Sequence, residues 1–157
     1  RNAVDVFLDA LIRNESFSVG DYLRELMRIV TSVAAHGAAV FIGRGTQFVL
    51  PGDKALHIRV VASEDMKVAQ IAKTLGIDEK DAVREIERVE NERRTFIRRH
   101  YGEDVTKASN YDLVINSGTT GIEGAAALIR EAYRARFGTV PNLDVSTAPA
   151  ALGPVID

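Results

Sequence analysis

The sequence predicts an α/β fold in which helices flank a mainly parallel sheet, and three observations carry this prediction. Helical and strand-like patterns alternate along the 157 residues. The strand-like stretches are short, apolar and β-branched, as buried parallel strands are. Glycines and capping residues stand where the helical stretches end. We expect one core with three strands, because 46% of the residues are hydrophobic and the length suits one domain.

Two helices are predicted before the first strand. Apolar residues recur at helical spacing over residues 3–14, which predicts an amphipathic helix. A second helix follows, with Ser18 or Asp21 as its N-cap. It should end at His36 and Gly37, because glycine readily adopts the left-handed conformation that closes a helix.

Two further helices are predicted from their caps. Ser63 should cap one helix that Gly76 ends, and Asp78 should cap a longer helix over residues 79–101. Gly102 provides the stop for this long helix.

The predicted strands lie at residues 38–43, 55–62 and 111–116. The first reads AAVFIG and is nearly continuous in apolar residues, so we expect it to be buried on both faces. A last helix should follow the third strand and end at Gly138. The domain would therefore span residues 1–138, and the Pro- and Ala-containing residues 139–157 would form a tail.

Composition excludes several function classes. The net charge of -2 and the pI near 6.0 provide no overall field for nucleic acid or anionic membranes. The absence of cysteine removes disulfides, thiolate metal sites and thiol nucleophiles, and suits a reducing cytoplasm. No apolar run approaches the roughly 20 residues that span a bilayer, so we expect a soluble, cytoplasmic protein. Because the chain begins with Arg1 and not with Met, we expect it to be a piece of a longer protein.

Gly43, Arg44 and Gly45 follow the first predicted strand and form a candidate binding site for a phosphate-bearing small molecule. Ligands of such folds lie beyond the carboxyl ends of the strands. Two glycines allow a close turn, and the guanidinium group between them can contact phosphate through two hydrogen bonds. The alternative is a tight turn whose arginine is simply solvated.

Small residues follow the third predicted strand, in the stretch NSGTTGIE. The free backbone N–H groups and the dipole at a helix start can bind an anion there. Alternatively, Thr120 and Glu123 have the spacing of a capping box, which would satisfy those donors internally.

Arginines gather at the end of the long predicted helix. Arg94 and Arg98 are four residues apart and share a face, and Arg93 and Arg99 stand beside them. Glutamates upstream make a solvated, ion-paired surface one interpretation. The other is phosphate binding, because residues 93–100 contain four arginines and no acidic residue.

Four ordered segments resemble the carboxyl-terminal half of the cytidylate-kinase-like family, within the P-loop nucleoside monophosphate kinases. The resemblance covers about residues 20–137. The segments are VFIGRGTQFVLPG, ALHIRVVAS, ERRTFIRRHYGED and YDLVINSG.

This resemblance implies a parallel sheet wrapped by helices, with a helical lid region. It also implies transfer of the γ-phosphoryl group of ATP to a CMP-like nucleoside monophosphate, with magnesium. Arg44 would then face the phosphate of the acceptor. Arg94 and Arg98 would be catalytic residues that contact the phosphoryl group during its transfer. Asn116, Ser117, Gly118 and Thr119 would lie near the adenine of the donor; no metal ligand is predicted.

The sequence departs from the family pattern in one decisive respect. The family's Gly-rich loop ending in Lys and Ser or Thr occurs nowhere in the 157 residues. Because that loop supplies most of the positioning in phosphoryl transfer, we expect this chain alone to be inactive. Asn91 also stands where the family tends to carry Asp, and Lys67 where an Arg often opens the lid helix.

Three functional hypotheses follow. The chain is the acceptor and lid portion of a phosphotransferase whose P-loop segment lies elsewhere; or it is a non-catalytic nucleotide-binding or regulatory remnant; or it is a homodimerising interaction module built on the helices of residues 3–33. The missing strand should leave an unpaired sheet edge and an exposed apolar strip. We expect that surface to be covered by a rearranged sheet, or by a homodimer in which the helices of residues 3–33 bury it; the missing P-loop segment is the other expected partner.

Overall fold

The computed structural model describes residues 19–142, which divide into two units, one ending at Pro51 and the other beginning at Gly52. The helix predicted over residues 3–14 lies outside the described residues, as do residues 143–157 of the predicted tail. The boundary predicted between residues 138 and 139 stays a prediction. Each unit is described by itself.

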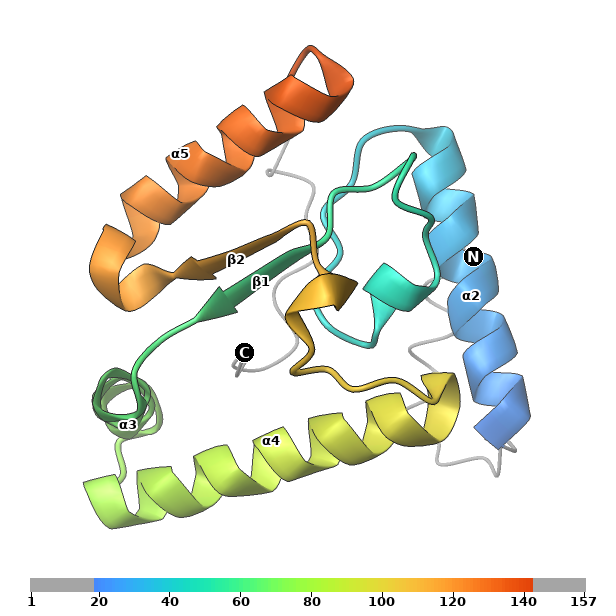
Figure 1. Cartoon of the computed structure of the whole chain (residues 1–157). Helices are drawn as coiled ribbons and strands as arrows, with labels where there is room; N and C mark the ends of the chain where they lie inside the picture. Colours follow the sequence, from blue (N-terminus) through green and yellow to red (C-terminus); the bar gives the residue numbers. More distant parts are fainter. Residues whose placement is uncertain (1–18, 143–157) are drawn as a thin grey trace. The chain divides into compact units, whose positions relative to one another are not determined.

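The first unit contains helix α2, Val19–His36, and a short 3-10 helix, η1, Thr46–Phe48 (Figure 1). The apolar face of α2 buries Leu26 and Val30, as the periodicity of the sequence predicts. Gly37 follows its last residue with a positive φ of 144°. The second predicted helix is therefore confirmed, including its end.

The strand predicted at residues 38–43 is wrong. This segment forms neither helix nor strand, and Val40 and Ile42 are 71% and 61% exposed. A strand is stable only when another strand accepts its hydrogen bonds, and local β-branched content does not supply that partner. The described part of the chain therefore has a parallel sheet of two strands and not of three.

The sheet belongs to the second unit and pairs β1, Ile58–Val61, with β2, Leu113–Asn116. The strands are parallel and run in register from the Ile58–Leu113 pair to the Val61–Asn116 pair. Figure 1 shows both arrows pointing toward the same end of the unit, where α3 follows β1. Parallel pairing is confirmed, although both strands are shorter than predicted.

Each strand of this sheet has one edge without a partner strand among the described residues. On the two faces of the sheet, Val60 and Val114 are 46% and 42% exposed, which is unusual because both faces of parallel strands are normally covered. That part of the sheet is missing, and what covers the unpaired edges, stay predictions.

Helices α3, Glu64–Leu75, and α4, Glu79–Tyr101, form the crossover between the strands. Their caps are as predicted: the Ser63 side chain accepts from the Met66 N–H, and Asp78 accepts from the Asp81 N–H. Gly76 and Gly102 end the two helices in the left-handed conformation.

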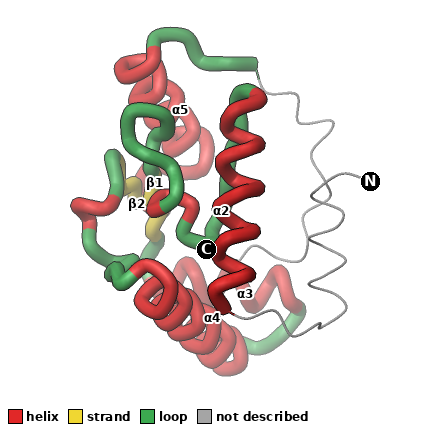
Figure 2. The backbone as a smooth tube through the Cα atoms, turned by 90° about the vertical axis from the view of Figure 1, so that its right-hand side faces the viewer, coloured by secondary structure: helices red, strands yellow, loops and turns green. Residues whose placement is uncertain are grey.

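The two crossover helices pack on each other and hold one small core. Val68 of α3 and Ala82 and Ile86 of α4 are its buried members. Figure 2 shows α4 and α5 at opposite ends of the view, with the sheet between them. The first half of α4 therefore packs on α3, and the arginines lie at the other end of the same helix.

Helix α5, Ser117–Phe137, begins directly after β2 and is interrupted at Gly121, whose φ of 69° and ψ of 171° are not helical. The predicted capping box of Thr120 and Glu123 does not form. Instead, the Thr120 hydroxyl lies within hydrogen-bond distance of the Asn116 and Gly121 carbonyl oxygens. A capping box requires a regular first helical turn, and the non-helical Gly121 between Thr120 and Glu123 interrupts it.

A carboxylate ties the start of both strands to the end of α5. Asp112 accepts the His57 backbone N–H at 2.7 Å, and its other oxygen lies 2.7 Å from an Arg136 nitrogen. Burial by itself would raise the pKa of Asp112, but the His57 N–H and the Arg136 guanidinium together lower it below the ordinary 3.8.

We expect Asp112→Asn to destabilise the chain, because the Arg136 pair is lost and an amide N–H₂ replaces an oxygen that accepts hydrogen bonds. The loss should be about 1–3 kcal/mol in the free energy of unfolding, measured by urea denaturation. Asp53→Asn, in an exposed turn, is the matched control and should change little. Equal stabilities of the two variants would contradict this role for Asp112.

Candidate functional site

The Gly43–Gly45 stretch is a left-handed turn in the first unit. Gly43, Arg44 and Gly45 have φ angles of 75°, 59° and 71°, and Thr46 closes the turn by donating to the Gly43 carbonyl oxygen. Arg44 is exposed. A positive φ is uncommon for a residue with a side chain, and costs about 1–2 kcal/mol relative to the right-handed region. The stretch is therefore a tight turn, which both interpretations of the sequence require. Glycine at position 44 would be less strained than the arginine that stands there.

In the second unit, Arg94 and Arg98 line one surface hollow. Thr95 lies between them on α4, and the opposite wall is the loop of residues 103–106. The structure thus brings the two predicted catalytic arginines together, at the i, i+4 spacing seen in the sequence.

The loop wall of this hollow is firmly held. Asp104 accepts from both the hydroxyl and the backbone N–H of Thr106, at 2.7 and 2.8 Å. These hydrogen bonds, with the nearby charges of Arg98 and Arg59, lower the pKa of Asp104. Arg59 of β1 also donates to the Thr106 carbonyl oxygen at 2.8 Å, which attaches the loop to the sheet.

Glu90 joins α3 to the arginine face of α4. One oxygen lies 2.6 Å from the Lys67 ammonium nitrogen, and the other lies 3.5 Å from an Arg94 nitrogen. The Lys67 hydrogen bond, assisted by the charges of Arg94 and Arg93, holds the pKa of Glu90 below its ordinary value. The sequence indicated an ion-paired surface for the glutamates of α4, Glu90 among them, but it did not indicate the Lys67 contact. Its signal was tertiary, because residues 67 and 90 become neighbours only when α3 packs on α4.

Arg93 has a different environment from its neighbour. Its Nε atom is buried and has no hydrogen-bond partner within the part of the chain that the structure describes. The sequence contained a signal, because Arg93 follows Ile86 by seven residues and precedes Ile97 by four, which are both buried.

The Asn116–Thr119 stretch lies at the carboxyl ends of the strands. The Asn116 side chain accepts from the Gly118 N–H at 3.0 Å, and the Ser117 hydroxyl donates to the Val61 carbonyl oxygen at 3.2 Å. A Cβ atom at Gly118 would lie 2.7 Å from the Met66 sulfur. The stretch is therefore the end of β2 with the compact first turn of α5, and it does not line the hollow of Arg94 and Arg98.

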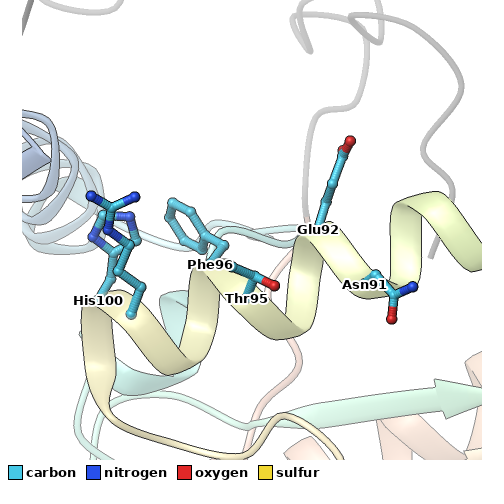
Figure 3. A pocket seen from close by; sticks show the side chains of 6 residues that line it. Asn91, Glu92, Thr95, Phe96 and His100 are labelled. Carbon is cyan, nitrogen blue, oxygen red and sulfur yellow. The ribbon is translucent and has the colours of Figure 1, made fainter.

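A second, shallow hollow runs along α4 itself and is lined by six residues of that helix. Figure 3 shows the rings of Phe96 and His100 beside one another, and their centroids are 4.3 Å apart. The lining residues are Asn91, Glu92, Thr95, Phe96, Arg99 and His100. None of the predicted site residues lies here.

Two other kinds of site are absent from residues 19–142. No group of three or more His, Asp or Glu side chains there could hold a metal ion. No helix in that range combines the length and the apolar character needed to cross a membrane.

Comparison with known proteins adds the family. A family model described as cytidylate kinase-like matches residues 1–119, which include every predicted site residue. The chain belongs to the cytidylate kinase-like family. A search of curated proteins gave no match. Family membership relates the chain to kinase-like phosphotransferases and agrees with the resemblance seen in its sequence.

The Glu90 contacts predict a specific dependence of stability on pH. Because the folded chain lowers the pKa of Glu90, the stabilisation is complete above the ordinary value of 4.5 and is lost as the pH falls through the folded value. We therefore expect Glu90→Gln to be less stable than the wild type at pH 7 by about 1 kcal/mol, with the difference shrinking below pH 4.5.

Urea denaturation at a series of pH values measures this difference. Glu87→Gln, at an exposed position of the same helix, is the control and should follow the wild type. A Glu90→Gln deficit that persists unchanged into the acid range would contradict the ion-pair explanation.

Proposed function

We propose that this chain is the acceptor and lid portion of a cytidylate kinase-like phosphotransferase, which transfers the γ-phosphoryl group of ATP to a CMP-like nucleoside monophosphate. The main support is the hollow in which Arg94 and Arg98 stand side by side. Paired guanidinium groups suit phosphoryl oxygens, because their N–H donors match those oxygens in geometry and charge. The family match supports the reaction class.

The roles follow from the chemistry of each group. Arg94 and Arg98 neutralise charge on the transferring phosphoryl group. Arg44 binds the acceptor phosphate from its exposed turn, and the compact Asn116–Thr119 turn contacts the adenine of ATP through backbone groups.

ATP and magnesium require groups beyond these. The described residues offer guanidinium donors but no cluster of carboxylates for a metal. We assign the positioning of ATP and magnesium to a Gly-rich loop with Lys and Ser or Thr, carried by polypeptide outside this sequence. The edges of β1 and β2 that have no partner strand among the described residues offer a place for such a segment to pair.

Two other functions remain candidates. A non-catalytic nucleotide-binding remnant is favoured by the absence of the Gly-rich loop from the 157 residues. A homodimerising module is favoured by the exposure of Val40 and Ile42.

The first functional prediction concerns binding. Arg44→Ala and Arg94→Ala should each weaken the affinity for CMP about tenfold or more, because a charge-assisted hydrogen bond contributes about 1.5–3 kcal/mol. Isothermal titration measures the change. Arg84→Ala is the matched control, since Arg84 is exposed and pairs with Asp81 on the other half of α4. Equal losses in all three variants would indicate a general electrostatic effect and not a site.

The second functional prediction concerns catalysis. The purified chain should show no transfer from ATP to CMP or dCMP above background, because arginines alone do not hold ATP, metal and acceptor in line. An extended chain that includes a Gly-rich loop, or a mixture with such a segment, should restore activity. Persistent inactivity of the completed protein would favour the non-catalytic remnant. Turnover by the isolated chain that is lost in Arg94→Ala would show that the loop is dispensable.

A further inference from the structure

The hollow of Arg94 and Arg98 has opposite charges on its two walls. The α4 wall carries the two arginines, whereas the loop wall carries the carboxylates of Glu103 and Asp104. No ion pair joins the two walls within residues 19–142. A bare anion that approaches the arginines therefore also meets the repulsion of the loop wall. The hollow suits a ligand that presents an anionic group to one wall and a hydrogen-bond donor to the other.

Asp104 has one carboxylate oxygen that the loop uses and one that it does not. Oδ1 accepts both the backbone N–H and the hydroxyl of Thr106, at 2.8 and 2.7 Å. Oδ2 has no hydrogen-bond partner among the described residues, and the side chain is exposed. Because an ionised carboxylate can only accept hydrogen bonds, Oδ2 requires a donor. It is accessible to a ligand in the hollow.

The loop wall holds Asp104 in one position. Three successive carbonyl oxygens of this wall, at residues 104–106, each accept a hydrogen bond from a different side chain. The donors are Asn110 at 2.9 Å, Tyr111 at 2.8 Å and Arg59 at 2.8 Å. The guanidinium group of Arg59 also lies 5.9 Å from the centroid of the Tyr111 ring. A ligand that contacts Asp104 therefore has little of the loop left to order.

Glu103 is the other carboxylate of this wall, and it is held less firmly. No hydrogen bond to its side chain occurs in the described part of the chain. A glutamate that rotates freely loses conformational entropy when a ligand fixes it, whereas Asp104 is already fixed by Thr106. Asp104 is therefore the better placed of the two to accept a directed hydrogen bond.

We propose that Asp104 is a specificity-determining residue, whose Oδ2 accepts a hydrogen bond from a hydroxyl group of the same molecule whose phosphate Arg94 and Arg98 contact. The ligand class is a phosphate monoester that carries hydroxyl groups, as the ribose of a nucleotide does. A site that hydrogen-bonds a hydroxyl group rejects the analogue without it, because its own polar group is left unpaired. The repulsion between Asp104 and phosphate strengthens this rejection. The assignment rests on the proposed function and adds a group that discriminates among phosphates.

The test compares two probes that share the phosphate monoester group, ribose 5-phosphate and methyl phosphate; only the first carries hydroxyl groups. NMR titration of the full 157-residue chain measures both dissociation constants. Asp104→Asn retains an oxygen that can accept from Thr106, but it replaces Oδ2 by an amide N–H₂. Glu103→Gln removes a charge from the same wall and is the matched control.

We expect the wild type to prefer ribose 5-phosphate to methyl phosphate about tenfold, and Asp104→Asn to reduce this preference about fivefold or more. Asp104→Asn should bind methyl phosphate about twofold more tightly, because a like charge is gone. Glu103→Gln should raise both affinities alike and keep the preference. A merely structural Asp104 would change both affinities by the same factor in Asp104→Asn, and that result would overturn the proposal. So would an equal loss of preference in Glu103→Gln.

Asp104→Ser keeps the test decisive if the asparagine variant does not fold. A serine hydroxyl can still accept the Thr106 N–H, but it provides no second oxygen, so the preference should fall as in Asp104→Asn. An undiminished preference in Asp104→Ser would overturn the role of Asp104.

CMP provides the last comparison, because it adds the amino group of the base as a donor. An effect of Asp104→Asn on CMP that is absent with ribose 5-phosphate would assign the contact to the base and overturn the hydroxyl assignment. If Arg94→Ala weakens binding of both phosphates while the wild type does not distinguish them, the proposed function stands and this assignment falls. If the wild type binds neither probe nor CMP, both fall.

Discussion

The parallel pairing of β1 with β2 is the constraint on which the arrangement of the second unit depends. Parallel neighbours cannot be joined by a tight turn, so the chain must leave one end of the sheet and return to the other. Here α3 and α4 form this crossover connection. The return loop brings Asp104 and Thr106 alongside Arg98, and Arg59 of β1 fastens the loop to the sheet. The wall opposite the arginines thus follows from strand direction.

The crossover could be predicted from sequence because its signals are local. Ser63 and Gly76 delimit α3, and Asp78 and Gly102 delimit α4, through contacts within one turn of each helix. The strand prediction for residues 38–43 was wrong for the opposite reason. Its β-branched residues are compatible with a strand, but no local signal shows whether another strand is available to pair with it.

The contacts of the candidate site also differ in whether local sequence indicates them. The i, i+4 spacing of Arg94 and Arg98 is visible in the sequence, and their shared hollow agrees with it. The Lys67–Glu90 contact required the packing of two helices, so no pattern within either helix indicated it. Arg93 is intermediate between these cases. Its place on the apolar stripe could be counted from the sequence, whereas the lack of a partner for Nε required atomic positions.

The left-handed turn at Arg44 has a consequence for how this position would change under selection. Glycine or asparagine adopts a φ of 59° more readily than arginine does, so the present residue is a poor choice by backbone preference alone. In a library of variants at residue 44, enrichment for heat resistance would drive the position away from arginine. Under the proposed role of Arg44 in binding the acceptor phosphate, enrichment for retention on an immobilised nucleotide would drive it back. The divergence of the two populations would separate what the backbone prefers from what the side chain contributes.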